Sequence, residues 1–194
     1  MSEQTMSDED IARAHVTPPT LHNAPVHLAD YDPAWPARYE RLAAGIRRAL
    51  GGVVLRLEHV GSTSVPGLCA KPILDILLTV ADPADEAAYV PPLEAVGYVL
   101  HIREPDWYEH RVLKVPGGEM PVHLHVLPDG CLEVPRMLGF RDRLRQHDED
   151  RDLYARTKRD LARRTWKYVQ NYADAKGEVV ESILARAGVL PGGG

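Results

Sequence analysis

Two neighbouring features of the sequence have the residue types needed to handle a phosphate group. Gly61-Ser62-Thr63 follows the alternating stretch of residues 53–60 and offers backbone N–H groups and two hydroxyls in a turn, which can hold an anion. The apolar run of residues 73–80 that comes next contains a single charged residue, Asp75. A buried carboxylate is costly without a partner, so Asp75 requires a cation or a set of hydrogen-bond donors. Together the turn and the carboxylate predict a phosphate-handling site.

Turn residues and apolar periodicity indicate the elements that position this site. Asp32-Pro33 leads into a helix that ends before Gly51-Gly52. Further helices are expected near residues 83–96, 135–146, 148–173 and 174–187, and strands near 53–60, 73–80, 98–103, 111–115 and 122–127. Strands followed by helices predict an α+β fold, with a small mixed sheet, flanking helices and a helical C-terminal segment.

The domain organisation follows from composition along the chain. Residues 1–22 are polar and show no sustained period, which predicts a disordered leader. Residues 23–190 are expected to form a single domain whose helical part begins at about residue 135. The sequence shows no secretory signal and no apolar run of membrane length, so we expect a cytoplasmic protein with no membrane partner.

Charge is unevenly distributed along the 194 residues. The net charge is −5, yet residues 136–167 hold 11 Lys and Arg against 6 Asp and Glu. This basic helical segment suits a small anionic ligand, although it also fits a solvated helix face. An acidic chain without an RNA-binding signature disfavours nucleic acid as a partner. Cys69 and Cys131 fit no zinc or disulfide spacing.

Several strings of residues resemble the GrpB family. They are GSTSVPGLCAKPILDILLTV at residues 61–80, DYDPAWP at 30–36, HLHV at 123–126 and FRDRLR at 140–145, with Tyr154, Lys158 and Leu161 further along. The resemblance runs from Val26 to Ala187 and therefore covers nearly the whole chain. It implies the nucleotidyltransferase superfamily fold, whereas the family itself indicates no particular reaction.

The resemblance also implies a metal centre. In that superfamily a Gly-Ser turn positions a triphosphate, and a strand presents two carboxylates, two residues apart, to Mg²⁺. Asp75 fills the first position, but Leu77 stands at the second. The third carboxylate position, on a later strand, matches His123-Leu124-His125, where alternation puts both imidazoles on one face. The implied ligands of a divalent Mg, Mn or transition-metal ion are thus Asp75, His123 and His125; the alternative is that both histidines bind Asp75 without a metal.

Other residues are assigned roles at the same site. Lys71 is expected to meet a phosphate or to neutralise Asp75, and is assigned with Asp75 to catalysis. Glu58 could supply a missing carboxylate, although a cross-strand ion pair also explains it. Tyr154 and Lys158 are four residues apart on one helical face, where they could hold a base and a phosphate or pack the helix. The residues assigned to nucleotide or phosphate binding are Gly61, Ser62, Thr63, Arg141, Tyr154 and Lys158.

Three functions are compatible with these assignments. The first is metal-dependent transfer of a nucleotidyl group from an NTP to a small-molecule acceptor. The second is a non-catalytic protein that binds a nucleotide or phospho-metabolite beside a degenerate metal site. The third treats Asp75, His123 and His125 as a facial triad for a redox metal. Leu77 is the residue on which the enzyme assignment depends, because it predicts either an unusual metal site or weak activity.

Overall fold

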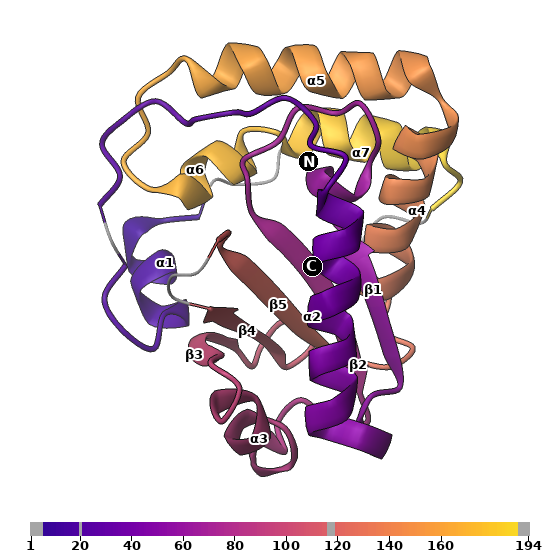
Figure 1. The fold of residues 1–194 in the computed structure, drawn as a ribbon. Coiled ribbons are helices and arrows are strands. Elements are labelled where there is room, and N and C mark those ends of the chain that lie inside the picture. Colours follow the sequence, from indigo (N-terminus) through magenta and orange to yellow (C-terminus); the bar gives the residue numbers. More distant parts are fainter. Residues whose placement is uncertain (1–5, 20, 116–118, 190–194) are drawn as a thin grey trace.

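A five-stranded mixed sheet forms the centre of the protein (Figure 1), as described by a computed structural model that covers residues 6–19, 21–115 and 119–189. The strands lie in the order β1-β2-β5-β4-β3. Only β2 and β5 run parallel, and the other neighbouring pairs are antiparallel. Their bounds are Arg56–Val60 (β1), Leu74–Val80 (β2), Val99–Glu104 (β3), His110–Val115 (β4) and Val122–Pro128 (β5).

One face of the sheet is closed by α2 (Trp35–Leu50) and α3 (Val90–Glu94). Alternation along β2 sends Leu74, Ile76 and Leu78 to this face, where they pack in one core with apolar residues of α2. Burial of this apolar surface is the main favourable term in folding the domain. The same alternation along β2 leaves Asp75, Leu77 and Thr79 on the opposite face.

The opposite face is covered only in part. Helix α4 (Glu133–Gln146) packs Val134 against Val60 of β1 and Leu77 of β2. Helices α5 (Asp148–Ala162), α6 (Val169–Asp174) and α7 (Gly177–Arg186) follow, and α5 and α7 pack on the loop before β2 through Val65 and Leu68. Figure 1 shows α5 lying above α6 and α7, on the far side of them from the sheet. This arrangement confirms the α+β fold with a helical C-terminal segment.

Three expected elements differ from the structure. In place of the expected helix 83–96 there is a short helical turn followed by α3. Pro91 and Pro92 lie in the first turn of α3, and Gly97 with its positive φ follows the end of α3. The expected helix 148–173 ends at Ala162 and gives way to α6. The leader contains α1 (Asp8–Ala14), because the Ser7 side chain caps its first turn and Ile11 is only 2% exposed.

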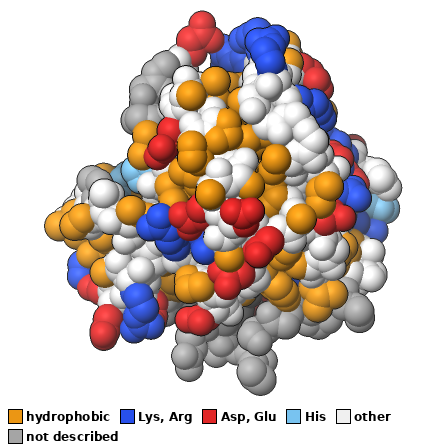
Figure 2. All heavy atoms as spheres, turned by 90° about the horizontal axis from the view of Figure 1, so that it is seen from below, with side chains coloured by type: hydrophobic (Ala, Val, Ile, Leu, Met, Phe, Trp, Pro, Cys, Tyr) orange, Lys and Arg blue, Asp and Glu red, His pale blue; other side chains and the backbone are white. Residues whose placement is uncertain are grey.

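The surface mixes charge types. Figure 2, which views the molecule from below Figure 1, shows acidic and basic side chains interspersed with hydrophobic ones. Near α3, Glu86 accepts hydrogen bonds from both Arg103 and Arg111 at 2.7 Å. Arg103 is exposed, so its pair contributes little to stability, whereas Arg111 is only 6% exposed. Among the helices that the structure describes, none is long and apolar enough to cross a membrane.

Candidate functional site

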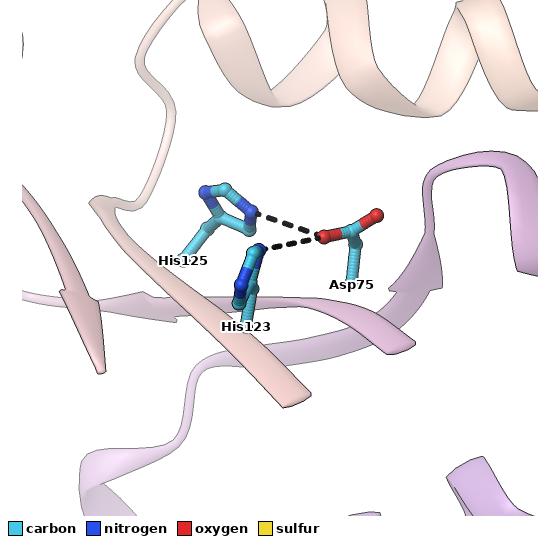
Figure 3. Close-up of side chains that lie close together, drawn as sticks. All are labelled: Asp75, His123 and His125. Carbon is cyan, nitrogen blue, oxygen red and sulfur yellow. Dashed lines mark ion pairs between the residues drawn. The ribbon is translucent and has the colours of Figure 1, made fainter. Parts of the chain in front are cut away.

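Asp75, His123 and His125 meet on the partly open face of the sheet (Figure 3). The parallel pairing of β2 with β5 places Asp75 opposite His123 and Leu77 opposite His125. The Asp75 Oδ1 atom lies 3.5 Å from His123 Nδ1 and 3.7 Å from His125 Nε2. One ligand atom from each residue lies within 4.8 Å of the others, so a single ion could contact all three.

The protonation states of this cluster suit metal coordination. Burial disfavours the charged Asp75 carboxylate, but its interactions with His123 and His125 outweigh burial and hold the pKa of Asp75 below its usual range. Burial also lowers the pKa of His123, more than its interaction with Asp75 raises it. At neutral pH the cluster therefore contains an ionised carboxylate and a neutral imidazole, which are the forms that bind a metal ion.

Gly61 is required by the position of the Asp75 carboxylate. The Gly61 backbone has φ +68°, and a Cβ atom built there would lie 2.4 Å from Asp75 Oδ2. The backbone of the turn thus packs directly against the carboxylate. The turn and the acidic strand, which are separated in sequence, form one continuous wall of the site.

Substituting Gly61→Ala should therefore displace Asp75 as well as strain the backbone. We expect the free energy of unfolding to fall by about 1–3 kcal/mol, together with weaker binding of Mn²⁺. Urea denaturation and calorimetric titration with MnCl₂ measure the two effects. Gly45→Ala in α2 is the matched control, because its Cβ meets no atom within 4 Å and should leave metal binding unchanged. Equal metal affinity in Gly61→Ala and wild type would contradict the expected displacement.

Hydrogen bonds within the turn fix its shape. The Ser64 hydroxyl donates to the Gly61 carbonyl at 2.6 Å, and the Thr63 hydroxyl lies 3.0 Å from His59 Nε2. Arg145 of α4 donates to the Ser64 carbonyl at 2.8 and 3.0 Å. Thr63 and Ser64 therefore close the turn from inside, whereas Ser62 interacts with the buried Tyr154 hydroxyl in the cavity.

Arg141, which the sequence assigned to phosphate binding, does not reach the cavity. Its guanidinium donates to Glu58 and to the His59 carbonyl at 3.0 Å, and to Asp142 at 2.8 Å. It is absent from the described residues that line the cavity. Glu58, expected as a spare carboxylate or an ion-pair partner, is the partner of this arginine. Arg141 and Arg145 thus tie α4 to the two ends of the turn.

A cavity of about 1100 Å³ extends from the metal-ligand cluster to the C-terminal helices. It joins nearly all the residues that the sequence assigned to the site, namely Gly61, Ser62, Thr63, Lys71, Asp75, His123, His125, Tyr154 and Lys158. Tyr154 and Lys158 are buried on α5, and burial raises the pKa of the tyrosine. Lys176 and Tyr172 also line the cavity and were missed by sequence analysis. The sequence gives no local signal for Lys176, because the expected helix over residues 174–187 contains it, whereas α7 begins at Gly177.

Glu104 and His110 extend the cluster behind His125. They are opposite each other in the β3–β4 pairing, and the Glu104 carboxylate lies 2.6 Å from His110 Nδ1. His110 Nε2 lies 3.1 Å from His125 Nδ1, and the two imidazoles stack with centroids 5.3 Å apart. When a metal ion takes the place of the His125–Asp75 interaction, this chain would accept the proton of His125 Nδ1 and so free the Nε2 lone pair for the ion. Sequence analysis missed it because strand register was needed to find it.

Loss of His110 should weaken metal binding through this orientation. We expect His110→Ala to reduce Mn²⁺ affinity about 10- to 100-fold, as is typical when a partner of a metal-bound histidine is removed. Calorimetry provides the affinity, and His110→Gln should restore part of it by supplying a polar partner for His125. The idea fails if both variants bind Mn²⁺ as wild type does. His101→Ala serves as the control. His101 also lines the cavity, but within the described residues it makes no hydrogen bond to His125.

The fold and the site together define a class: small α+β proteins whose mixed sheet holds a possible metal centre beside a glycine turn. The GrpB protein family model matches residues 25–186, and the chain belongs to the GrpB family. It is 55% identical to a UPF0157 protein of Halalkalibacterium halodurans over 93% of this chain and 92% of that protein. The crystal structure of GrpB from Enterococcus faecalis is similar, with a TM-score of 0.73, 30% identity and coverage of 83% of this chain and 96% of that one.

A longer relative contains a similar segment. The dephospho-CoA kinase of Mycobacterium tuberculosis is 31% identical over 80% of this chain, but the match spans only 44% of that kinase. The same kind of segment therefore occurs both in chains of about this length and within a larger enzyme. The family and fold assignments made from the sequence are confirmed by these comparisons.

Proposed function

We infer that this protein transfers a nucleotidyl group from an NTP to a small-molecule acceptor with the help of a divalent metal ion. The observation that carries the proposal is the placement of Asp75, His123 and His125 against the Gly61 turn in one large cavity. A triphosphate and a second substrate need room beside a metal site, and the cavity volume of about 1100 Å³ is sufficient for both.

The residues present fit a divalent ion. Asp75 Oδ1, His123 Nδ1 and His125 Nε2 would hold it, and an N₂O donor set favours Mn²⁺ or another transition-metal ion over Mg²⁺. When bound, such an ion neutralises charge on the phosphates and polarises the α-phosphorus. The remaining contributions come from side chains and backbone of the chain itself.

Each part of the cavity has a role in the proposed reaction. The Gly61 turn and Ser62 orient the triphosphate, and Lys71 stabilises charge on the departing pyrophosphate. The acceptor oxygen forms a bond to the α-phosphorus as the bond to the bridging oxygen breaks. Pyrophosphate leaves with that electron pair, and the acceptor proton passes to water. Holding both substrates in line supplies much of the rate enhancement.

The alternative is a protein that binds a nucleotide or phospho-metabolite without transferring it. It is favoured by Leu77, which occupies the second carboxylate position and is fully buried. The dephospho-CoA kinase relatives add dephospho-CoA to the ligands worth testing. In this case the same cavity binds its ligand stoichiometrically and releases no product.

Calorimetric titration separates these proposals. ATP, GTP, CTP, UTP and dephospho-CoA are titrated with Mn²⁺, with Mg²⁺ and with EDTA, and pyrophosphate release is followed with a panel of hydroxyl, amine and carboxylate acceptors. Metal-dependent NTP binding with pyrophosphate release supports transfer. Binding in EDTA without any product supports the non-catalytic alternative, and absence of binding for all ligands contradicts both.

A further inference from the structure

Three lysines from three separate segments converge on the end of the cavity beside Asp75. Lys71 precedes β2, Lys158 lies on α5 and Lys176 precedes α7. The Lys71 and Lys176 ammonium groups lie 5.9 and 4.5 Å from the centroid of the same Tyr172 ring. The fold thus gathers like charges around one aromatic side chain, which costs energy unless an opposite charge is present.

The described part of the chain gives these lysines no salt-bridge partner. Lys158 is only 2% exposed and donates to the Cys69 carbonyl at 2.5 Å, with its ammonium 5.2 Å from the Tyr154 ring centroid. A carbonyl and a ring satisfy one donor but do not neutralise a buried charge.

Tyr172 adds an independent sign of a missing ligand. Its side chain is fully buried and lines the cavity, yet its hydroxyl has no hydrogen-bond partner within the described residues. Buried hydroxyls in native proteins normally have a partner, so an unpaired one beside the ammonium groups of Lys71 and Lys176 indicates an acceptor supplied from outside the chain.

We propose that Lys71, Lys158, Lys176 and Tyr172 form a receptor for a chain of linked phosphates, such as the β- and γ-phosphates of a nucleotide. A polyphosphate supplies both the negative charges that the lysines lack and an acceptor for the Tyr172 hydroxyl. This inference deepens the proposed function by assigning the phosphate end of the cavity. Only the identity of the anion as a nucleotide triphosphate rests on the proposed function. Binding of inorganic polyphosphate, which has no nucleotidyl group to transfer, tests the receptor independently of that function.

The test is calorimetric titration of the full chain with orthophosphate, pyrophosphate and tripolyphosphate in EDTA. Affinity should rise with the number of linked phosphates, because more lysines are engaged at once. ATP in EDTA then shows whether a nucleotide's triphosphate enters the same receptor. Tripolyphosphate binding would support the receptor, and if no NTP then releases pyrophosphate with Mn²⁺ and the acceptor panel, the transfer reaction is contradicted while the receptor stands. Absence of binding of any polyphosphate at millimolar concentration would overturn the receptor.

Two pairs of variants test the residues. Lys176→Met should weaken tripolyphosphate binding about 10- to 100-fold, while Lys167→Met should not, since Lys167 lies on a different tyrosine ring and is exposed. Tyr172→Phe should weaken binding about 3- to 10-fold. Tyr98→Phe is its control, because the Tyr98 hydroxyl is also buried and unpaired within the described residues but does not line the cavity. Unchanged affinity in both Lys176→Met and Tyr172→Phe overturns the assignment, whatever their stability.

Proton uptake gives a second readout. Burial lowers the pKa of Lys158 to about 7 and those of Lys71 and Lys176 to about 8. The charged and titratable groups that face them are Asp75, Lys114, Asp174 and the Cys69 thiol. A bound polyanion raises the lysine pKa values, so binding at pH 8 should take up protons and should tighten as the pH falls towards 7. Titrations in buffers of different ionisation enthalpy measure the uptake; binding without uptake would contradict the receptor.

Discussion

Asp75→Asn is expected to reduce Mn²⁺ affinity by at least about 100-fold, or about 2.8 kcal/mol, and to abolish metal-dependent NTP binding. Among the three candidate ligands, Asp75 provides the negative charge, and the two imidazoles alone leave a divalent ion uncompensated. The amide keeps the shape of the carboxylate, so its packing against Gly61 is preserved. Calorimetry with MnCl₂ and metal analysis of the purified protein measure the loss.

The matched control for Asp75→Asn is Asp82→Asn. Asp82 lies in the turn after β2, where its side chain accepts a hydrogen bond from the Ala84 amide at 2.9 Å, far along the strand from the cluster. The Asp82→Asn protein should bind Mn²⁺ with the affinity of the wild type. Retained metal binding and pyrophosphate release in Asp75→Asn would show that the metal centre lies elsewhere. Lost metal binding with intact NTP binding in EDTA would instead favour the non-catalytic alternative.

The sequence was sufficient to place the three candidate metal ligands on one face of the sheet, but not to identify the residues that support them. Asp75 on an apolar strand and alternation in His123-Leu124-His125 correctly placed all three side chains on one face. Strand order and register are set by long-range packing, so the Glu104–His110–His125 chain could not be derived from local pattern.

Charged residues were the least predictable part of the site. Arg141 fits a phosphate-binding pattern by sequence, but in the fold its guanidinium donates to Asp142, Glu58 and the His59 carbonyl. Lys176 has no sequence feature that assigns it to the site, and only the folded structure places it in the cavity beside Tyr172. Long cationic side chains reach several partners from one backbone position, so their roles depend on tertiary structure.

Leu77→Asp is expected to lower the free energy of unfolding by at least about 3 kcal/mol, and not to create a second metal carboxylate. Leu77 is fully buried and packs with Val60, Leu127 and Val134 beneath α4. Its cross-strand neighbours are Glu58 and His125. An aspartate there would lose apolar contacts and place a charge in a dry core beside an existing carboxylate. Urea denaturation measures the change.

Leu77→Met is the control for this substitution, because it conserves volume and should cost less than about 1.5 kcal/mol. A stable Leu77→Asp protein that binds a second Mn²⁺ would show that α4 can move away and that a two-carboxylate centre is accessible. The packing argues otherwise, since α4 closes this end of the sheet and also fixes the Gly61 turn through Arg145. The apolar residue at position 77 thus belongs to the same interface that holds the turn, and His125 on the neighbouring strand is the candidate ligand that lies opposite it.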